Sequence, residues 1–191
     1  MSTIPRDVLV PPAGYRCREA GLFIAQLDDQ SARLTKDTAN LKVAALEWQP
    51  APGMNTIGML LAHIAIVEVY WTQVGPLGLT TFETESVLGI GLDDDGMPLA
   101  EGGAPPATLR GKDLAFFTDL LGRARAYARR AVADLTDADL EREVTRSRRD
   151  GTAHEVLNLR WILYHMLEHE AGHYGQINLL THQFRLAGRR D

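Results

Sequence analysis

The sequence predicts an all-α protein, a four-helix bundle with long connections, and three observations lead to this class. Apolar residues recur with helical periodicity along most of the 191 residues, and no stretch alternates with period two long enough to build a sheet. Breaks rich in proline and glycine separate the first three of four such segments, and a polar stretch precedes the fourth. A chain of this length buries a sizeable core without disulfides, and its one cysteine cannot form one internally. We therefore expect a single domain over residues 1–191.

The first two helices are separated by a clear break. A helix is expected over about residues 14–38, and its apolar stripe consists of Phe23, Leu27, Leu34 and Leu41. Residues 47–53 end the pattern, because two prolines and a glycine do not fit a helix interior. Asn55 or Thr56 is then a suitable N-cap for the second helix, IGMLLAHIAIVEVYWTQV. This helix is apolar on nearly every face, which is typical of a helix packed on several sides.

A long connection precedes the third helix. Residues 75–111 are rich in glycine and proline, carry the acidic run 93–95, and contain one short helix at about 80–88. A loop of this length inside a compact domain is usually functional or partly mobile. The third helix is expected over about 112–135, with an apolar stripe on one face and four arginines on its outer face.

The last helix follows a short polar stretch. Thr136 caps a brief helical turn, and Asp150-Gly151 is a turn signal that indicates a small hairpin within 142–156. The fourth helix is expected over about 158–186, where glycine and terminal charges end it.

Charge and composition exclude several classes. A net charge of −5 and a pI near 5.7 argue against nucleic-acid binding, which usually needs a basic surface. The N-terminal segment has no apolar run typical of a signal peptide. The longest apolar stretch, 57–74, contains His63 and Glu68 and is interpreted as a buried helix, not a membrane span. Together with the lone cysteine, these features predict a cytoplasmic protein without nucleic-acid or membrane partners.

Histidines gather near the C-terminus, where five of the six follow residue 153. His165, His169 and His173 are spaced four apart in the last helix, so adjacent members lie on one face. Each step turns the side chain by about 40°, so two of them share a metal more readily than three. His169 and His173 fall on the inward arc and are the expected ligands. His165 lies at its edge as a supporting residue, and His154 and His182 are expected at the surface.

A metal explains this pair better than a buried pair of free imidazoles. A single buried histidine is more often a hydrogen-bonded core residue, but two adjacent imidazoles are costly to desolvate without a shared partner. His63, in the middle of the apolar second helix, is the expected third ligand. Three neutral imidazoles with an open fourth position suit zinc, nickel or iron(II), and ligand chemistry alone does not choose among them.

Two other metal motifs are disfavoured. His169 to His173 reads HExxH, the zinc protease signature in which Glu170 is the general base. However, the extended pattern fails at Gln176 and Leu179, and no glutamate follows to act as a further ligand. A di-iron bundle site would need a second Glu-x-x-His, which the second helix does not contain.

Three segments resemble the DinB/YfiT superfamily of metal-dependent proteins. These segments are WQPAPG followed by Thr56 and Ile57, then LLAHIAIVEVYW, then LRWILYHMLEHEAGHYGQINLL. The resemblance implies an up-up-down-down four-helix bundle, often a homodimer. It also implies a metal held by one histidine of the second helix and two ligands four apart on the last helix. These positions are His63, His169 and His173, the set that the spacing indicates.

The resemblance also implies chemistry. Similar proteins are maleylpyruvate isomerases and S-transferases that use mycothiol, bacillithiol or glutathione. There the metal lowers the pKa of a bound thiol, or it activates water for hydrolysis. The expected function is a thiol-dependent S-transferase or isomerase that takes a low-molecular-weight thiol and an electrophilic substrate. A metal-dependent hydrolase and a non-catalytic metal-binding stress-response bundle remain alternatives.

Several further side chains receive roles at this stage. Glu170 is the candidate acid–base residue, and Arg160 or Arg110 is a candidate to receive the carboxylate of a thiol. Glu68 is expected to orient a ligand or to pair with an arginine. Three aromatic residues are expected in the core or at an interface: Tyr70, Trp71 and Tyr174.

Overall fold

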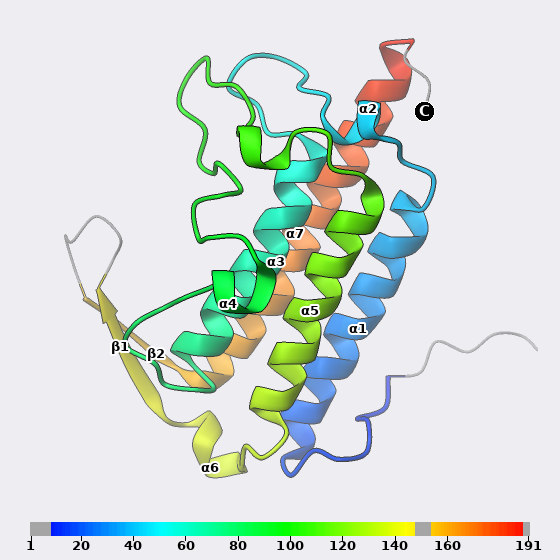
Figure 1. The fold of residues 1–191 in the computed structure, drawn as a ribbon. Helices are drawn as coiled ribbons and strands as arrows, with labels where there is room; N and C mark the ends of the chain where they lie inside the picture. Colours follow the sequence, from blue (N-terminus) through cyan, green and yellow to red (C-terminus); the bar gives the residue numbers. More distant parts are fainter. Residues whose placement is uncertain (1–8, 148–153, 189–191) are drawn as a thin grey trace, which may run out of the picture.

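The computed structural model describes residues 9–147 and 154–188, and four long helices pack side by side within them (Figure 1). The long helices are α1 (Arg18–Thr38), α3 (Ile57–Val74), α5 (Leu114–Val132) and α7 (Leu159–Leu186). The short elements are α2 (Val43–Leu46), α4 (Glu85–Leu88), the 3-10 helix η1 (Ala107–Leu109), α6 (Asp137–Leu140), β1 (Glu143–Ser147) and β2 (His154–Asn158). The mostly helical fold is therefore as predicted.

Capping side chains set where the long helices begin. The Thr56 side chain accepts a hydrogen bond from the backbone N–H of Met59, which settles the N-cap of α3. Asp113 caps α5 in the same way, so this helix starts two residues later than the predicted 112. Cys17 accepts from a backbone N–H at the start of α1, which also begins later than expected. Glycine or proline punctuation in the sequence marks such boundaries only approximately.

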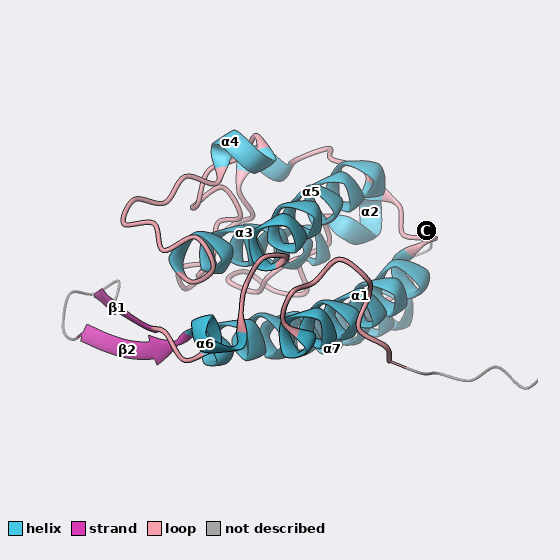
Figure 2. Ribbon diagram, turned by 90° about the horizontal axis from the view of Figure 1, so that it is seen from below, coloured by secondary structure: helices cyan, strands magenta, loops and turns pink. Residues whose placement is uncertain are grey.

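Helix α3 lies in the centre of the fold. It packs against α5 on one side and α7 on another, while α1 packs against α7 and α5. Figure 2 shows α3 and α5 as one layer over α1 and α7. Within the described residues, α3 alone is long and apolar enough to cross a membrane, but 83% of it is buried in the fold. Its apolar composition is thus explained by contacts with neighbouring helices.

The directions of the helices differ from the predicted order. Helices α1 and α7 run one way and α3 and α5 the other (Figure 1). The N–H of Arg16 donates to the carbonyl of Ala133 over 2.9 Å, which places the start of α1 beside the end of α5. The ring centroids of Trp48 and Phe184 are 5.6 Å apart, so α7 ends where the chain approaches α3. The order is up-down-down-up instead of up-up-down-down.

Connection lengths account for this order. The chain between α1 and α3 turns back at the same end of the bundle, which makes these helices antiparallel (Figure 1). The 75–113 connection instead returns along the bundle, so α5 starts at the same end as α3. With 18 residues, α3 is about 27 Å long, a distance that this connection spans easily. A single long crossover thus replaces the two that an up-up-down-down bundle needs.

The long connection is packed against α3, and its predicted short helix is limited to α4. The Gln73 side chain donates to the carbonyl of Glu83 over 2.8 Å and accepts from the same residue's N–H over 3.0 Å. The hydroxyl of Thr84 donates to the carbonyl of Ile90. Leu88 and Asp95 are almost fully buried. These contacts place the acidic run of the connection beside the middle of the bundle.

The expected hairpin is present as an antiparallel pair. Strands β1 and β2 pair Glu143 with Asn158 and Ser147 with His154. The predicted turn at Asp150-Gly151 lies outside the described residues. Strand β2 leads directly into α7, whose first turn is capped by the Asn158 side chain. The hairpin therefore stands at the end of the bundle where α7 begins (Figure 1).

A buried ion cluster joins all four long helices, and it contains Arg125, which was wrongly expected on the outer face of α5. The guanidinium of Arg125 on α5 donates to both carboxylate oxygens of Glu68 on α3, at 2.6 and 3.1 Å. It also donates to Glu170 on α7 over 2.8 Å and to Asp28 on α1 over 3.1 Å. The hydroxyl of Ser31 on α1 donates to the second oxygen of Glu170 over 2.6 Å. Every carboxylate in this cluster thus has a partner from another helix.

Replacing the guanidinium should destabilise the fold strongly. In Arg125→Met, the buried carboxylates of Glu68 and Glu170 lose their cation, so we expect a loss of about 3–5 kcal/mol in the free energy of unfolding. Urea denaturation followed by circular dichroism measures it. Arg33→Met is the matched control, because Arg33 pairs with Asp29 on the surface of α1 and such pairs contribute less than about 1 kcal/mol. Equal stability losses in the two variants would contradict a central role for the cluster.

Candidate metal centre

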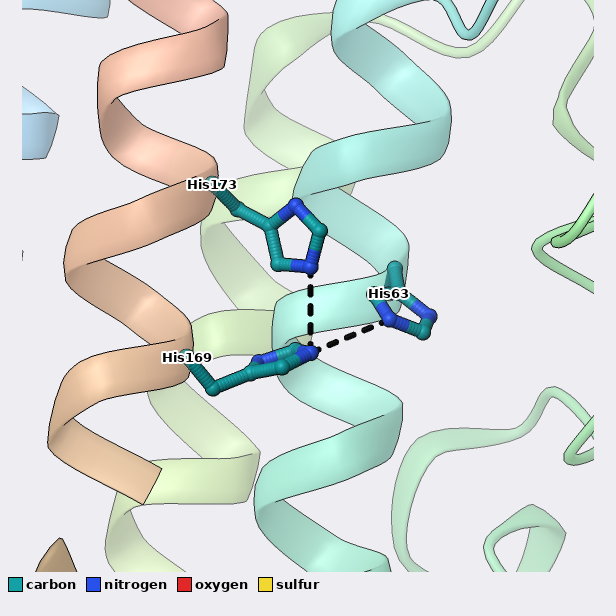
Figure 3. Close-up of side chains that lie close together, drawn as sticks. All are labelled: His63, His169 and His173. Carbon is teal, nitrogen blue, oxygen red and sulfur yellow. Dashed lines mark hydrogen bonds between the residues drawn. The ribbon is translucent and has the colours of Figure 1, made fainter. Parts of the chain in front are cut away.

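Three histidine side chains from two helices meet at one point (Figure 3). His63 comes from the middle of α3, while His169 and His173 come from successive turns of α7. The Nε2 atom of His169 lies 3.1 Å from Nε2 of His63 and 3.1 Å from Nε2 of His173. One ligand atom of each residue lies within 4.8 Å of those of the other two. The three residues predicted as ligands are therefore brought together.

The outer nitrogens of two rings are held by acceptors. Nδ1 of His63 lies 2.7 Å from a carboxylate oxygen of Asp95, and Nδ1 of His173 lies 2.9 Å from Oε1 of Gln176. Each acceptor requires a proton on the nitrogen that faces it, which leaves the Nε2 lone pair of that ring free. Partners of this kind commonly orient metal-binding histidines and fix their tautomer.

Hydrogen bonding alone does not satisfy the three inner nitrogens. With protons on the Nδ1 atoms of His63 and His173, both rings present lone pairs towards Nε2 of His169. Nε2 of neutral His169 can donate to only one of them, so the lone pair of the other ring is left without a donor. A cation at this point accepts all three lone pairs and removes the conflict. This is the observation by which the site fits a metal.

Burial favours the neutral, metal-binding form of His169 and His173. Burial, followed by the nearby His173, His63 and His165, lowers the pKa of His169 to about 3. Burial also lowers the pKa of His173, against the opposing effect of its bond to Gln176. A neutral imidazole carries the lone pair that coordinates a metal. The site is thus prepared for coordination near neutral pH.

Two of the three nitrogen–nitrogen separations suit a tetrahedral ion. Zinc–nitrogen bonds of about 2.0–2.1 Å at a tetrahedral angle place neighbouring nitrogens about 3.3 Å apart. The two measured separations of 3.1 Å are close to this value. Three histidines leave a fourth coordination position for water or a substrate, as in catalytic zinc sites.

A pocket adjoins the histidines on one side. It has a volume of about 360 Å³, and His63 and His169 form part of its wall. The rest of the lining is largely apolar and comes from α3, the long connection, β1 and α7: Ile66, Val67, Tyr70, Trp71, Phe82, Leu92, Asp95, Met97, Arg146 and His165. The 75–111 connection thus forms part of the pocket wall, through Phe82, Leu92, Asp95 and Met97.

Three residues near the predicted ligands also received roles from the sequence: His165, Glu68 and Glu170. His165 stacks on Trp161, with centroids 4.9 Å apart, and its centroid lies 5.8 Å from that of His169, so it supports the site from the side. Glu68 pairs with Arg125, which is one of its two predicted roles. Glu170 is buried and bonds to Arg125 and Ser31, and burial raises its pKa. Its acid–base role stays a prediction.

The arginines and aromatic residues assigned roles from the sequence lie in different places. Arg160 pairs with Glu19 and Glu141 on the outer side of α7, and Arg110 lines a different pocket beside η1. Neither is part of the lining beside the histidines. Tyr174 donates to Asp37 and packs against the core, as expected. Tyr70 and Trp71 also contact the core, as expected, and in addition they line the pocket.

Two functional candidates were missed from the sequence. Asp95 was noted only as one of three consecutive aspartates, and Arg146 only as part of a polar stretch. The buried position of Asp95 beside His63 depends on how the long connection folds back onto α3. Arg146 reaches the pocket because the hairpin stands beside α3. The acidic run in a long connection was the one signal that pointed towards Asp95.

The fold and the site together define a helical bundle with a three-histidine centre built on its second and fourth long helices. The sequence profile described as the DinB superfamily matches residues 26–177, and the chain belongs to that superfamily. Its fold is similar to that in the crystal structure of a conserved protein from Enterococcus faecalis, with a TM-score of 0.62 and 15% sequence identity. That similarity covers 84% of this chain and 93% of the other. The comparison with curated proteins found no match.

Removing any of the three histidines should abolish metal binding. We expect the wild-type protein, purified without chelator, to carry one divalent transition metal per chain, measured by elemental analysis. His63→Ala, His169→Ala and His173→Ala each remove a ligand and should lose the metal.

His165→Ala is the control for these variants, because this histidine lies beside the cluster without belonging to it. It should keep the metal. Loss of the ion in this variant alone, or a wild-type protein with no ion, would refute the assignment of ligands.

Asp95→Asn should weaken metal binding without abolishing it. The amide no longer supplies the charge that orients His63 and raises its basicity, and such changes weaken affinity about 10–100-fold. Competition with a chromogenic chelator measures the dissociation constant. Asp93→Asn removes the same charge from an exposed position on the same connection and should leave the affinity unchanged. Equal effects of the two variants would mean that only the net charge of the connection matters.

Proposed function

We propose that this protein is a metal-dependent enzyme that uses a low-molecular-weight thiol to attack an electrophilic substrate, as an S-transferase or isomerase. Zinc or nickel is the proposed ion, with iron(II) as a further possibility, held by His63, His169 and His173. A cation bound there would lower the pKa of a coordinated thiol and supply a thiolate nucleophile.

The observation that carries this proposal is the position of the histidines at the wall of a pocket. Structural zinc sites are closed by four protein ligands, whereas catalytic sites keep one position for water or substrate. Within the described residues, the metal-binding group contains three histidines and no fourth ligand. His63 and His169 also line the pocket, so a small molecule in the pocket lies next to the coordination site.

The chain's own thiol does not serve this chemistry. Cys17 is 1% exposed, and its Sγ donates to a carboxylate oxygen of Asp137 over 2.9 Å at the start of α1. Burial raises its pKa, which keeps it protonated. A thiolate nucleophile at the histidines therefore has to come from a separate molecule, which supports the choice of a small thiol as co-substrate.

A metal-dependent hydrolase is the second candidate. The same open position suits a water molecule, whose pKa falls to about 7 on zinc in comparable sites. The largely apolar lining favours an organic body over a water-filled site and so supports the thiol reaction more strongly. A non-catalytic metal-binding bundle remains the alternative if the pocket takes up no substrate. Cytoplasmic location and a homodimeric state are part of the proposal.

Screening for turnover distinguishes these possibilities. The metal-loaded protein is incubated with glutathione, mycothiol or bacillithiol and an electrophilic acceptor, and product is followed by mass spectrometry. We expect thioether or isomer formation that depends on the metal and disappears in His169→Ala. His182→Ala, a variant of an exposed histidine on the same helix, should keep the activity.

Two other results of the screen would contradict the proposed thiol-dependent enzyme. Hydrolysis of ester or amide substrates without added thiol, lost in the same variant, would favour the hydrolase. Stoichiometric metal with no turnover in either screen would identify a binding protein and overturn the proposed enzyme.

A further inference from the structure

The pocket beside the histidines has a charged end opposite them. Arg146 on β1 lines it, with its guanidinium carbon 4.6 Å from the centre of the Trp71 ring. Its Nη1 donates to the hydroxyl of Tyr70 over 3.3 Å. The walls between this end and His63 are apolar, and two of their members, Phe82 and Leu92, remain more than a third exposed. Exposed apolar side chains at a pocket mouth are typical of ligand sites.

The guanidinium has donors to spare. Nε and Nη2 of Arg146 donate to one carboxylate oxygen of Glu155, at 3.1 and 2.9 Å. A guanidinium has five N–H donors, and the contacts within the described residues use three of them. Tyr70 accepts from Arg146, and in the part of the chain that the structure describes no acceptor is recorded for its own O–H. The two side chains thus offer adjacent donors at the pocket wall.

Helix geometry gives the distance between the two ends. His63 and Tyr70 are seven residues apart on α3, about two turns, so they lie on one face. At 1.5 Å per residue, the separation along the helix is about 10 Å. Ile66 and Val67 lie between them and also line the pocket. A molecule that reaches both ends needs an apolar middle of this length.

We propose that the pocket binds a substrate with an apolar or aromatic body and a carboxylate, with the carboxylate at Arg146 and Tyr70 and the reacting end at the three histidines. This rests on the proposed function, because it places the reacting group at the metal. The apolar body lies along α3 against Trp71 and Phe82. Arg146, Tyr70 and the apolar walls determine specificity and take no part in the bond that is made or broken.

A pair of thiols that differ only in the head group at the far end, a carboxylate or a hydroxyl, tests this assignment. Mercaptooctanoate and mercaptooctanol are titrated into the metal-loaded protein by calorimetry. We expect the carboxylate compound to bind about tenfold more tightly, the factor of one charge-assisted hydrogen bond. In Arg146→Met this preference should disappear while mercaptooctanol binds as before, which also shows that the variant is folded.

Two further variants sharpen the test. Tyr70→Phe removes one donor and should reduce the preference several-fold without abolishing it. Arg33→Met removes a surface guanidinium on α1 and should keep the preference in full. Equal affinities of the two thiols for the wild type, or a preference that survives in Arg146→Met, would overturn the proposal.

Octanoate and octanol, which carry no thiol, separate this proposal from the thiol chemistry. If the thiols bind no more tightly than these analogues, the thiol part of the proposed function is wrong. A preference for octanoate over octanol that depends on Arg146 would still support the carboxylate end of the pocket. Absence of any preference in both pairs would overturn the pocket assignment, whatever the metal does.

Discussion

One guanidinium inside the bundle sets the geometry on which the metal centre depends. Arg125 holds carboxylates from α1, α3 and α7, and its Nη2 donates to both Glu68 and Glu170. Glu170 directly follows His169 in α7, and Glu68 lies little more than one turn beyond His63 in α3. The cluster therefore fixes the axial register of the two helices that carry the histidines. Precise register is what a metal site built from two helices requires.

Burial has opposite consequences for the two polar clusters of the core. In the ion cluster, burial raises the pKa of Glu170, while Arg125 and the hydrogen bond from Ser31 oppose this effect and favour the charged form. Within the described residues, no carboxylate is bonded to the inner nitrogens of the three histidines, and burial lowers the pKa of His169 and favours its neutral form. Asp95 acts only on the outer nitrogen of His63. The same apolar bundle thus holds the charged guanidinium of Arg125 at one level and the neutral imidazole nitrogens of the histidines at the next.

Features that depend on nearby residues were predicted from the sequence more successfully than features that depend on long-range packing. The bounds of α3 and the N-caps Thr56 and Thr136 follow from side chains within one helical turn, and the structure has them as predicted. His63, His169 and His173 were found because helical spacing and an isolated polar residue in an apolar helix are local features as well. The directions of α3 and α7 relative to α1 were wrong, and Asp95 and Arg146 were missed. These depend on where a connection and a hairpin pack, which no short window of sequence encodes.

The pocket beside the histidines bears on what the metal centre does. The histidines approach from α3 and α7, and Asp95 contacts the outer nitrogen of His63. The pocket borders the rings of His63 and His169 and continues along α3 towards Arg146. A metal site that only stabilised the bundle would be enclosed by a fourth protein ligand and would need no apolar pocket beside it. The apolar pocket, with the guanidinium of Arg146 at its far end, supports a metal centre that receives an organic anion.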